Sequence, residues 1–294
     1  MIFVVGLLQA ETVKVIVPYA AGTNTDVLSR VLADSLNKKL KQHQAVVQNK
    51  PGAGGDIATR ILATEDPNSI SLLVNTAAGV ALGSILSTSD YDYDNLVPLV
   101  RVGDSPQVFV ASSKSDIRTF NDVLMRKSTT YGSGGAFTRV LGEMIAAETG
   151  KNMIGVPYSG VSQSLTDLLS GQLESGFLYP NNAKVYIENK QIVPLAVTAS
   201  KRVEQLPDVP TFAELGIKDM ATVNYVVVVN KTTKTKDLAE IKQALQETLQ
   251  EAEVKQKLNG LGIVLSASSN VSSTYLDDER KKYIKLLKKF NIKE

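Results

Sequence analysis

The sequence contains no cysteine and no tryptophan, and it has only one histidine. Without cysteine, these residues cannot form a disulfide, a thiolate metal site or a cysteine nucleophile. The one histidine, His43, lies in a polar Lys-Gln-His-Gln turn, where we expect a solvated side chain and not a catalytic base. The patterns GxSxG and HExxH are missing too, and no carboxylates cluster at metal-ligand spacing. We therefore expect no enzyme, no metal site and no cofactor.

The sequence also has no large excess of charge of one sign and no long apolar run. The chain has 32 Lys and Arg against 30 Asp and Glu, a net charge of +2, and only the C-terminal helix is markedly basic. This balance gives no support to binding of nucleic acid or of a membrane surface. No stretch approaches the roughly 18 apolar residues that a membrane span requires.

The length and the apolar content favour a chain with two lobes. A chain of 294 residues, 43% of them apolar, is long for one compact domain and can fill two cores. The first ten residues, MIFVVGLLQA, are apolar and end in a small residue. We interpret residues 1–10 as a remnant of a secretory signal peptide, with an additional strand as the alternative.

The stretch from Val13 to Arg30 predicts a buried strand, a loop of small residues and an amphipathic helix. The strand is rich in β-branched residues and ends at Pro18, and Thr23 with Asp26 resembles a capping box. In an open α/β sheet such a loop lies at the carboxyl end of a strand, with the positive end of the helix dipole behind it. We expect an anion-binding site here.

Two further loops follow strands in the first lobe. A glycine-rich turn at 49–56 lacks both the P-loop lysine and the glycine spacing of a dinucleotide fold, so a nucleotide site is not expected. Either a tight backbone turn or ligand contact explains its glycines. The strand at 71–74 leads into Asn75–Gly79, whose small and hydroxyl-bearing residues resemble the first loop. Together the loops suggest one wall of a ligand site.

The rest of the chain predicts a second lobe and a return to the first. Residues 107–111 are expected to cross into the second lobe, and the strand at 225–229 is expected to cross back. In between, strands end at loops near 132–135, 157–160 and 179–180, which repeats the pattern of the first lobe. Two long amphipathic helices, with a solvated lysine face on the second, then complete the first lobe.

Several motifs in this order resemble the Bug family, the periplasmic solute receptors of tripartite tricarboxylate transporter systems. The resemblance covers about residue 11 to the C-terminus. The matching elements are VPYAAGTNTD at 17–26, NKPGAGG at 49–55, VPYSG at 156–160, Asp167-Leu168, Gly171-Gln172, LAVT at 195–198, Arg202 and LPDVPT at 206–211.

The resemblance implies an α/β fold of the type II periplasmic-binding architecture, with two lobes joined by two crossing strands. It places lobe 1 at 11–107 and 224–294 and lobe 2 at 108–223. It further implies a periplasmic, monomeric receptor that closes on a small organic acid and delivers it to a membrane permease. The ligand-binding residues implied by position are Tyr19, Gly22, Thr23, Asn24, Thr25, Thr76 and Ala77 in lobe 1, and Ser133, Gly134, Tyr158, Ser159, Gly160 and Tyr179 in lobe 2.

Some of these residues also have a purely structural interpretation. Asp26 is expected to complement the first helical turn, Tyr19 to pack or to line the site, and Thr76 and Ser159 to cap helices. Asp167 and Arg202 are expected to maintain the fold.

Departures from the family pattern bear on the solute. Leu178 or Tyr179 replaces a frequent aspartate, which favours an acid without an amino group. Asn230–Lys234 replaces a Pro-Gly-Thr-Pro turn, where we expect a flexible corner. A periplasmic sensor of a two-component system and a hydrolase with a hydroxyl-rich cleft are the alternative functions.

Overall fold

The chain forms two compact α/β units. The computed structural model describes residues 11–86, 91–133, 136–158, 161–218, 220–233, 236 and 238–289. The signal-peptide prediction for residues 1–10 therefore lies outside the described part. Unit 1 comprises Met1–Gly103, Tyr225–Leu258 and Leu265–Asp278, and unit 2 comprises Asp104–Asn224, Asn259–Val264 and Glu279–Glu294. The two-lobe α/β fold predicted from the sequence is confirmed.

Unit 1 is built on a six-stranded mixed sheet with the strand order β11-β4-β10-β3-β1-β2. β1 lies between β2 and β3 and runs parallel to both, whereas β10 is antiparallel to β3. β-branched and aliphatic residues fill β1, β3 and β10, which suits strands covered on both faces. The strands are β1 (Glu11–Val17), β2 (His43–Asn49), β3 (Ile70–Thr76), β4 (Leu96–Ser105), β10 (Val223–Asn230) and β11 (Val264–Leu265).

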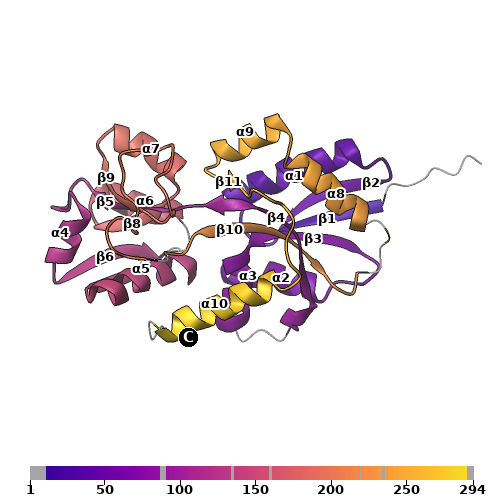
Figure 1. Ribbon diagram of the computed structural model, residues 1–294, viewed down its shortest axis with the longest axis horizontal. Helices are drawn as coiled ribbons and strands as arrows, with labels where there is room; N and C mark the ends of the chain where they lie inside the picture. Colours follow the sequence, from indigo (N-terminus) through magenta and orange to yellow (C-terminus); the bar gives the residue numbers. More distant parts are fainter. Residues whose placement is uncertain are drawn as a thin grey trace, which may run out of the picture. The chain divides into compact units, whose positions relative to one another are not determined.

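Helices cover both faces of this sheet. α1 and α8 lie on one face and α2 and α3 on the other (Figure 1). Ile16 of β1 and Leu73 of β3 pack against Leu62 of α2 and Val80 of α3 in one buried cluster. The helices are α1 (Asn24–Lys39), α2 (Asp56–Ala63), α3 (Ala77–Leu86), α8 (Leu238–Thr248) and α9 (Ala252–Gly260), with short 3-10 turns η1 (Ala53–Gly55) and η2 (Tyr93–Asn95).

The order of these connections creates a topological switch point between β1 and β3. α1 leads from β1 to β2 on one side, and α2 then leads from β2 back across β1 to β3. The two crossovers run in opposite directions over the sheet, so their helices lie on opposite faces. Ligands of open α/β sheets bind at the carboxyl ends of the strands at such a point.

Unit 2 has a similar arrangement of strands around β6. Its five-stranded sheet has the order β7-β6-β8-β5-β9, and β6 is parallel to both β7 and β8. The strands are β5 (Val108–Ser112), β6 (Ser128–Ser133), β7 (Asn152–Pro157), β8 (Ser175–Leu178) and β9 (Ile192–Val197). The helices are α4 (Phe120–Met125), α5 (Ala136–Thr149), α6 (Val161–Ser170) and α7 (Pro180–Glu188), while α10 (Tyr275–Lys289) begins in unit 1 and continues in unit 2.

Two parts of the chain differ from the sequence-based prediction. The crossing into unit 2 occurs along β4, whereas β5 (Val108–Ser112) lies entirely within the second sheet, so the predicted crossing strand at 107–111 is wrong. Pro106, which has no N–H to donate, separates the two strands. The predicted helix across 238–258 is divided into α8 and α9. Between them the N–H of Gln250 donates to the carbonyl oxygen of Glu247 (2.9 Å) and the N–H of Glu251 to that of Thr248 (3.1 Å), which turns the chain.

Asn230 connects the corner after β10 to α2. The buried side chain of Asn230 donates from Nδ2 to the carbonyl oxygens of Leu62 (3.0 Å) and Ala63 (2.9 Å). Its Oδ1 accepts from the N–H (2.9 Å) and the hydroxyl (2.8 Å) of Thr232. Asn230 thus ties this corner to the last turn of α2. Lys234 lies outside the described residues, and the flexibility of the corner stays a prediction.

A glycine on α5 allows a large aromatic side chain to fill the core of unit 2. Tyr131 of β6 is fully buried and contacts Phe177, which stacks in turn on Phe109. A Cβ atom placed on Gly142 would lie 2.0 Å from the Tyr131 ring. α5 can therefore approach β6 only because residue 142 has no side chain.

We expect Gly142→Ala to destabilise the protein by about 2 kcal/mol, because the buried Tyr131 ring must shift to accommodate the methyl group. Chemical denaturation monitored by tyrosine fluorescence measures this loss. Gly260→Ala is the matched control: no atom lies within 4 Å of the added methyl group, and stability should stay within about 0.5 kcal/mol of the parent protein. Equal stability of the two variants would contradict the proposed close approach.

Candidate functional site

The loop between β1 and α1 is held by the buried carboxylate of Asp26. Its side chain is 3% exposed and accepts hydrogen bonds from the N–H of Gly22 (2.9 Å), Nδ2 of Asn49 (2.9 Å) and the guanidinium of Arg30 (3.0 Å). Asn49 also donates to the carbonyl oxygen of Tyr19 (3.0 Å). The structural role predicted for Asp26 is confirmed.

These contacts keep the Asp26 carboxylate ionised. Burial on its own would raise the pKa, but the hydrogen bonds from Arg30, Gly22 and Asn49 outweigh burial and hold the pKa below its usual value of 3.8. Because the pKa is lower in the folded state, the stabilisation is fully present above the pKa of the unfolded chain, about 4. It is lost as the pH falls through the lower pKa of the folded state. The loop is therefore fully supported at neutral pH.

Two residues predicted to bind the ligand are occupied within the loop. The N–H of Gly22, in the left-handed region with φ +85°, is bonded to Asp26. Thr23 is the N-cap of α1: its hydroxyl oxygen accepts from the N–H of Asp26 (3.4 Å) and donates to the carbonyl oxygen of Ala20 (2.9 Å). The capping box is incomplete, since the carboxylate of Asp26 bonds Gly22 and not Thr23. A ligand role for Gly22 and Thr23 stays a prediction.

Thr25 is better placed to receive a ligand. It lies in the first turn of α1 and is 4% exposed, and its carbonyl oxygen accepts from the hydroxyl of Ser29 (2.7 Å). Its own N–H and hydroxyl make no hydrogen bond with the described residues. The N-terminal N–H groups of a helix have no intrahelical partner and favour anions. Thr25 thus supplies two neutral donors at the end of β1.

A second group of donors lies at the start of α3. Thr76 caps this helix, because its hydroxyl oxygen accepts from the N–H of Gly79 (2.9 Å). The capping role considered for Thr76 is confirmed. Ala77 and Ala78 are buried in the first turn, and their N–H groups make no hydrogen bond with the described residues. Ala77 can therefore contribute backbone only, as its methyl group lies in the core.

Asn75 is a polar residue that the sequence analysis did not include among the ligand-binding residues. It is fully buried (0% exposed), and its Oδ1 accepts from the N–H of Thr76 (2.7 Å). Its Nδ2 has no hydrogen-bond partner in the described part of the chain. A buried donor without a partner costs free energy unless water or a ligand satisfies it. The signal in the sequence is a single amide directly after the apolar run Leu72-Leu73-Val74.

The ends of β1 and β3 are neighbours, so these donors belong to one edge of the sheet. Ile16 of β1 lies opposite Leu73 of β3, which brings the residues that follow them side by side. A Cβ atom on Gly55 would be 3.1 Å from Pro18 and 3.6 Å from Nδ2 of Asn75. The glycine-rich turn thus packs against both strand ends. We call this group the donor edge; it consists of Thr25, Asn75, Ala77 and Ala78.

Tyr19 and Asn24 lie beside the donor edge. The Tyr19 ring is half-buried, and its hydroxyl oxygen would be 3.7 Å from a Cβ atom on Gly55, so the tyrosine borders the glycine-rich turn. Asn24 is half-buried at the first position of α1. Contact of either residue with a ligand stays a prediction.

In unit 2 the predicted residues follow three neighbouring strands. Ser133 ends β6, Tyr158 follows β7 and Tyr179 follows β8, where it is the N-cap of α7. The N–H of Tyr158 donates to the carbonyl oxygen of Ser133 (2.9 Å), and its hydroxyl donates to Asp167 (2.7 Å). Burial and the Asp167 carboxylate raise the pKa of Tyr158 to about 12. Gly134, Ser159 and Gly160 lie outside the described residues.

The residues expected to maintain the fold do so. Arg202 forms an ion pair with Glu214 (3.1 Å) and bonds the carbonyl oxygen of Pro207 (3.3 Å), while Asp167 orients Tyr158. His43 differs from its prediction, because it is 6% exposed at the start of β2 and not solvated. It therefore lies at the amino end of the strands, away from the donor edge.

Comparison with known proteins identifies the family. The family model described as "Tripartite tricarboxylate transporter family receptor" matches residues 28–292. The chain belongs to this receptor family. The receptor is 29% identical to protein BugT of Bordetella pertussis over 282 residues, which cover 92% of this chain and 86% of BugT.

Solved structures agree with this assignment. The structure of the periplasmic binding protein BugD has a TM-score of 0.83 and 26% identity, and covers 96% of this receptor and 98% of BugD. The structure of R. palustris Rpa4515 with adipate has a TM-score of 0.83, 23% identity and coverage of 96% and 97%. The family resemblance predicted from the motifs is confirmed, and the chain is a solute-binding receptor and not an enzyme. No helix in the described residues is long and apolar enough to cross a membrane.

Proposed function

We propose that this receptor is periplasmic, captures a small organic carboxylate and delivers it to a tripartite tricarboxylate-type membrane transporter. One observation carries the proposal: at the switch point of the first sheet, the donor edge presents hydrogen-bond donors that no described residue uses. All of these donors are neutral. Several oriented dipoles can hold an anion without a fixed cation, and the ligand can then be released again.

The cation closest in sequence supports this choice of chemistry. Arg30 is bound to Asp26 through two hydrogen bonds, and this pair is internally neutral. A ligand carboxylate at the donor edge would thus meet helix N-termini, the hydroxyl of Thr25 and the amide of Asn75. The adipate found with Rpa4515 is a small dicarboxylate, which supports the same ligand class for this receptor.

The second lobe is proposed to bind the remainder of the solute. We assign this role to Ser133, Gly134, Tyr158, Ser159, Gly160 and Tyr179, and we propose that the lobes close when both loop sets contact the ligand. A ligand that binds the closed state more tightly shifts the population towards that state. Leu178 is buried in the core of unit 2, so it offers no anchor for an amino group. We therefore propose an acid without an amino group.

A thermal-shift panel of dicarboxylates, tricarboxylates, aromatic acids and amino acids tests the proposal. A ligand at about 100 times its dissociation constant should stabilise the receptor by roughly 2.7 kcal/mol, which gives a clear rise in Tm. We expect at least one acid without an amino group to produce this rise, while the matching amides, which lack the negative charge, produce none. Stabilisation by amino acids alone, or by amides as strongly as by acids, would contradict the proposal.

A further inference from the structure

Positive charge is concentrated in one short segment of the chain. Residues 280–289 contain six Lys and Arg and no acidic residue. The remaining chain has 26 basic and 30 acidic residues and is net negative. The sequence-based expectation against membrane-surface binding rested on the overall charge of +2, which does not reveal this separation. Asp277, Asp278 and Glu279 precede this segment, so the positive charge lies in the later turns of α10.

The helix presents its lysines on one side. Lys281, Lys285 and Lys288 recur at helical spacing, are exposed and make no ion pair or hydrogen bond with the described residues. On the opposite side Tyr283 and Leu287 are buried. We call Lys281, Lys285 and Lys288 the lysine face.

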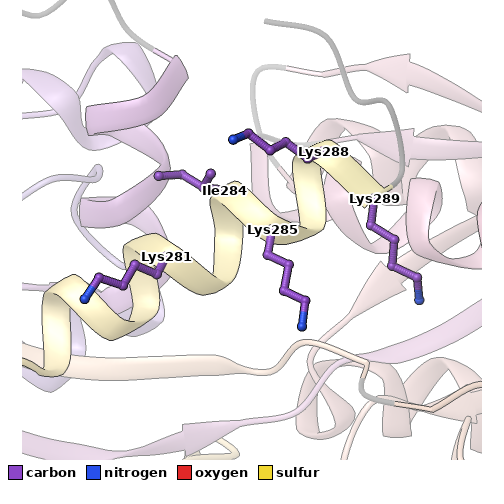
Figure 2. A pocket seen from close by; sticks show the side chains of 5 residues that line it. All are labelled: Lys281, Ile284, Lys285, Lys288 and Lys289. Carbon is purple, nitrogen blue, oxygen red and sulfur yellow. The ribbon is translucent and has the colours of Figure 1, made fainter.

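Lys281, Lys285 and Lys288 share this exposed side of α10 with Ile284 and Lys289 (Figure 2). The flanking lysines are neutralised, since Lys282 pairs with Glu279 (3.5 Å) and Lys289 with Glu148. Ionised ammonium groups without counter-charges attract any large anionic surface.

We propose that the lysine face binds the surface of an anionic phospholipid membrane. This inference rests on the proposed function. A receptor that is bound to the membrane surface diffuses in two dimensions, which shortens its search for a membrane transporter. The residue type favours lipid headgroups: lysine ammonium groups are flexible point charges, whereas recognition of protein carboxylates favours the planar, bidentate guanidinium of arginine. Among the described residues of this side, Ile284 is the large apolar side chain and it is half-buried, so the proposed contact is electrostatic and without insertion of these residues.

Co-sedimentation with lipid vesicles tests the inference. At low salt, the full chain should bind vesicles containing roughly one third phosphatidylglycerol and not vesicles of phosphatidylcholine alone. The variant K281E/K285E/K288E should lower the partition coefficient roughly 100-fold, because each lysine near an anionic surface increases binding by about tenfold or less. The variant K281Q/K285Q/K288Q, which keeps good helix-forming residues, should also weaken binding strongly. High salt should abolish binding of the parent protein.

The matched control is K41E/K201E/K218E, which makes the same change in net charge at exposed lysines without ion pairs among the described residues. It should retain binding within about threefold of the parent protein. Failure of the parent protein to bind the anionic vesicles, or equal losses in the two charge-reversed variants, would overturn the inference. Carboxylate-induced thermal shifts should be unchanged in every variant, which separates this result from a failure of the proposed function.

Discussion

Thr25→Asp should lower the affinity for the carboxylate at least roughly 100-fold while leaving the receptor folded. An aspartate in the first turn of α1 interacts favourably with the helix dipole, but position 25 is buried and precedes the Asp26 carboxylate, so we expect the free energy of unfolding to fall by about 1–3 kcal/mol. The same charge repels a ligand carboxylate by about 4 kcal/mol at 4 Å and an effective dielectric constant of about 20. Isothermal titration calorimetry with the best acid of the panel measures the loss.

Two further variants separate charge from shape. Thr25→Val keeps the size of the side chain and removes the hydroxyl, and should lower affinity about tenfold. Asn270→Asp adds the same charge at an exposed position of unit 1, where Oδ1 still accepts from Gln246, and should leave affinity unchanged. If Thr25→Asp binds the acid as tightly as the parent protein, Thr25 does not contribute to the site. Should Thr25→Asp fail to fold, Thr25→Val decides the question.

Asp26→Ala should lower the free energy of unfolding by about 3 kcal/mol at neutral pH. The ion pair with Arg30 contributes little, because the Arg30 side chain is largely exposed. Most of the loss comes from the N–H of Gly22 and Nδ2 of Asn49, which lose a charged hydrogen-bond acceptor. The loop between β1 and α1 is also destabilised, because Asn49 no longer connects it to Asp26. Thermal unfolding should show a fall in Tm of roughly 5–10 °C.

Asp34→Ala is the matched control, since Asp34 is an exposed carboxylate of the same helix. Its substitution should change stability by no more than about 0.5 kcal/mol. The difference between the Asp26 variant and the parent protein should also shrink below about pH 4, where the unfolded chain takes up a proton, and should vanish as the pH falls through the lower pKa of the folded carboxylate. Equal Tm values for the Asp26 and Asp34 variants would show that this network does not hold the loop.

Local patterns in the sequence predict most of the fold. The β-branched run before Pro18, the cap at Thr23 and the small-residue turns locate β1, α1 and the loops at strand ends. Contacts between distant residues decide the rest. Thr248 of α8 bonds Ser35 of α1, and Asn230 at the end of β10 bonds the last turn of α2. Neither contact leaves a periodic signal.

The site is predicted less completely than the fold. Family motifs point to loops at strand ends, where binding of the ligand stays a prediction, and they do not show which N–H groups the loops use internally. Gly22 is bonded to Asp26, whereas Thr25 keeps its donors. Asn75 is missed because one amide at a strand end resembles an ordinary polar residue until its burial and its unpartnered Nδ2 are known.

The most direct measurement is a crystal structure of the receptor with the best acid from the panel. The account predicts a ligand carboxylate within hydrogen-bonding distance of the Thr25 hydroxyl and of the first N–H groups of α3, with Asn75 Nδ2 bonded to it directly or through one water. A carboxylate bound at any other place, with Thr25 and Asn75 unchanged and without a new partner, would contradict the account.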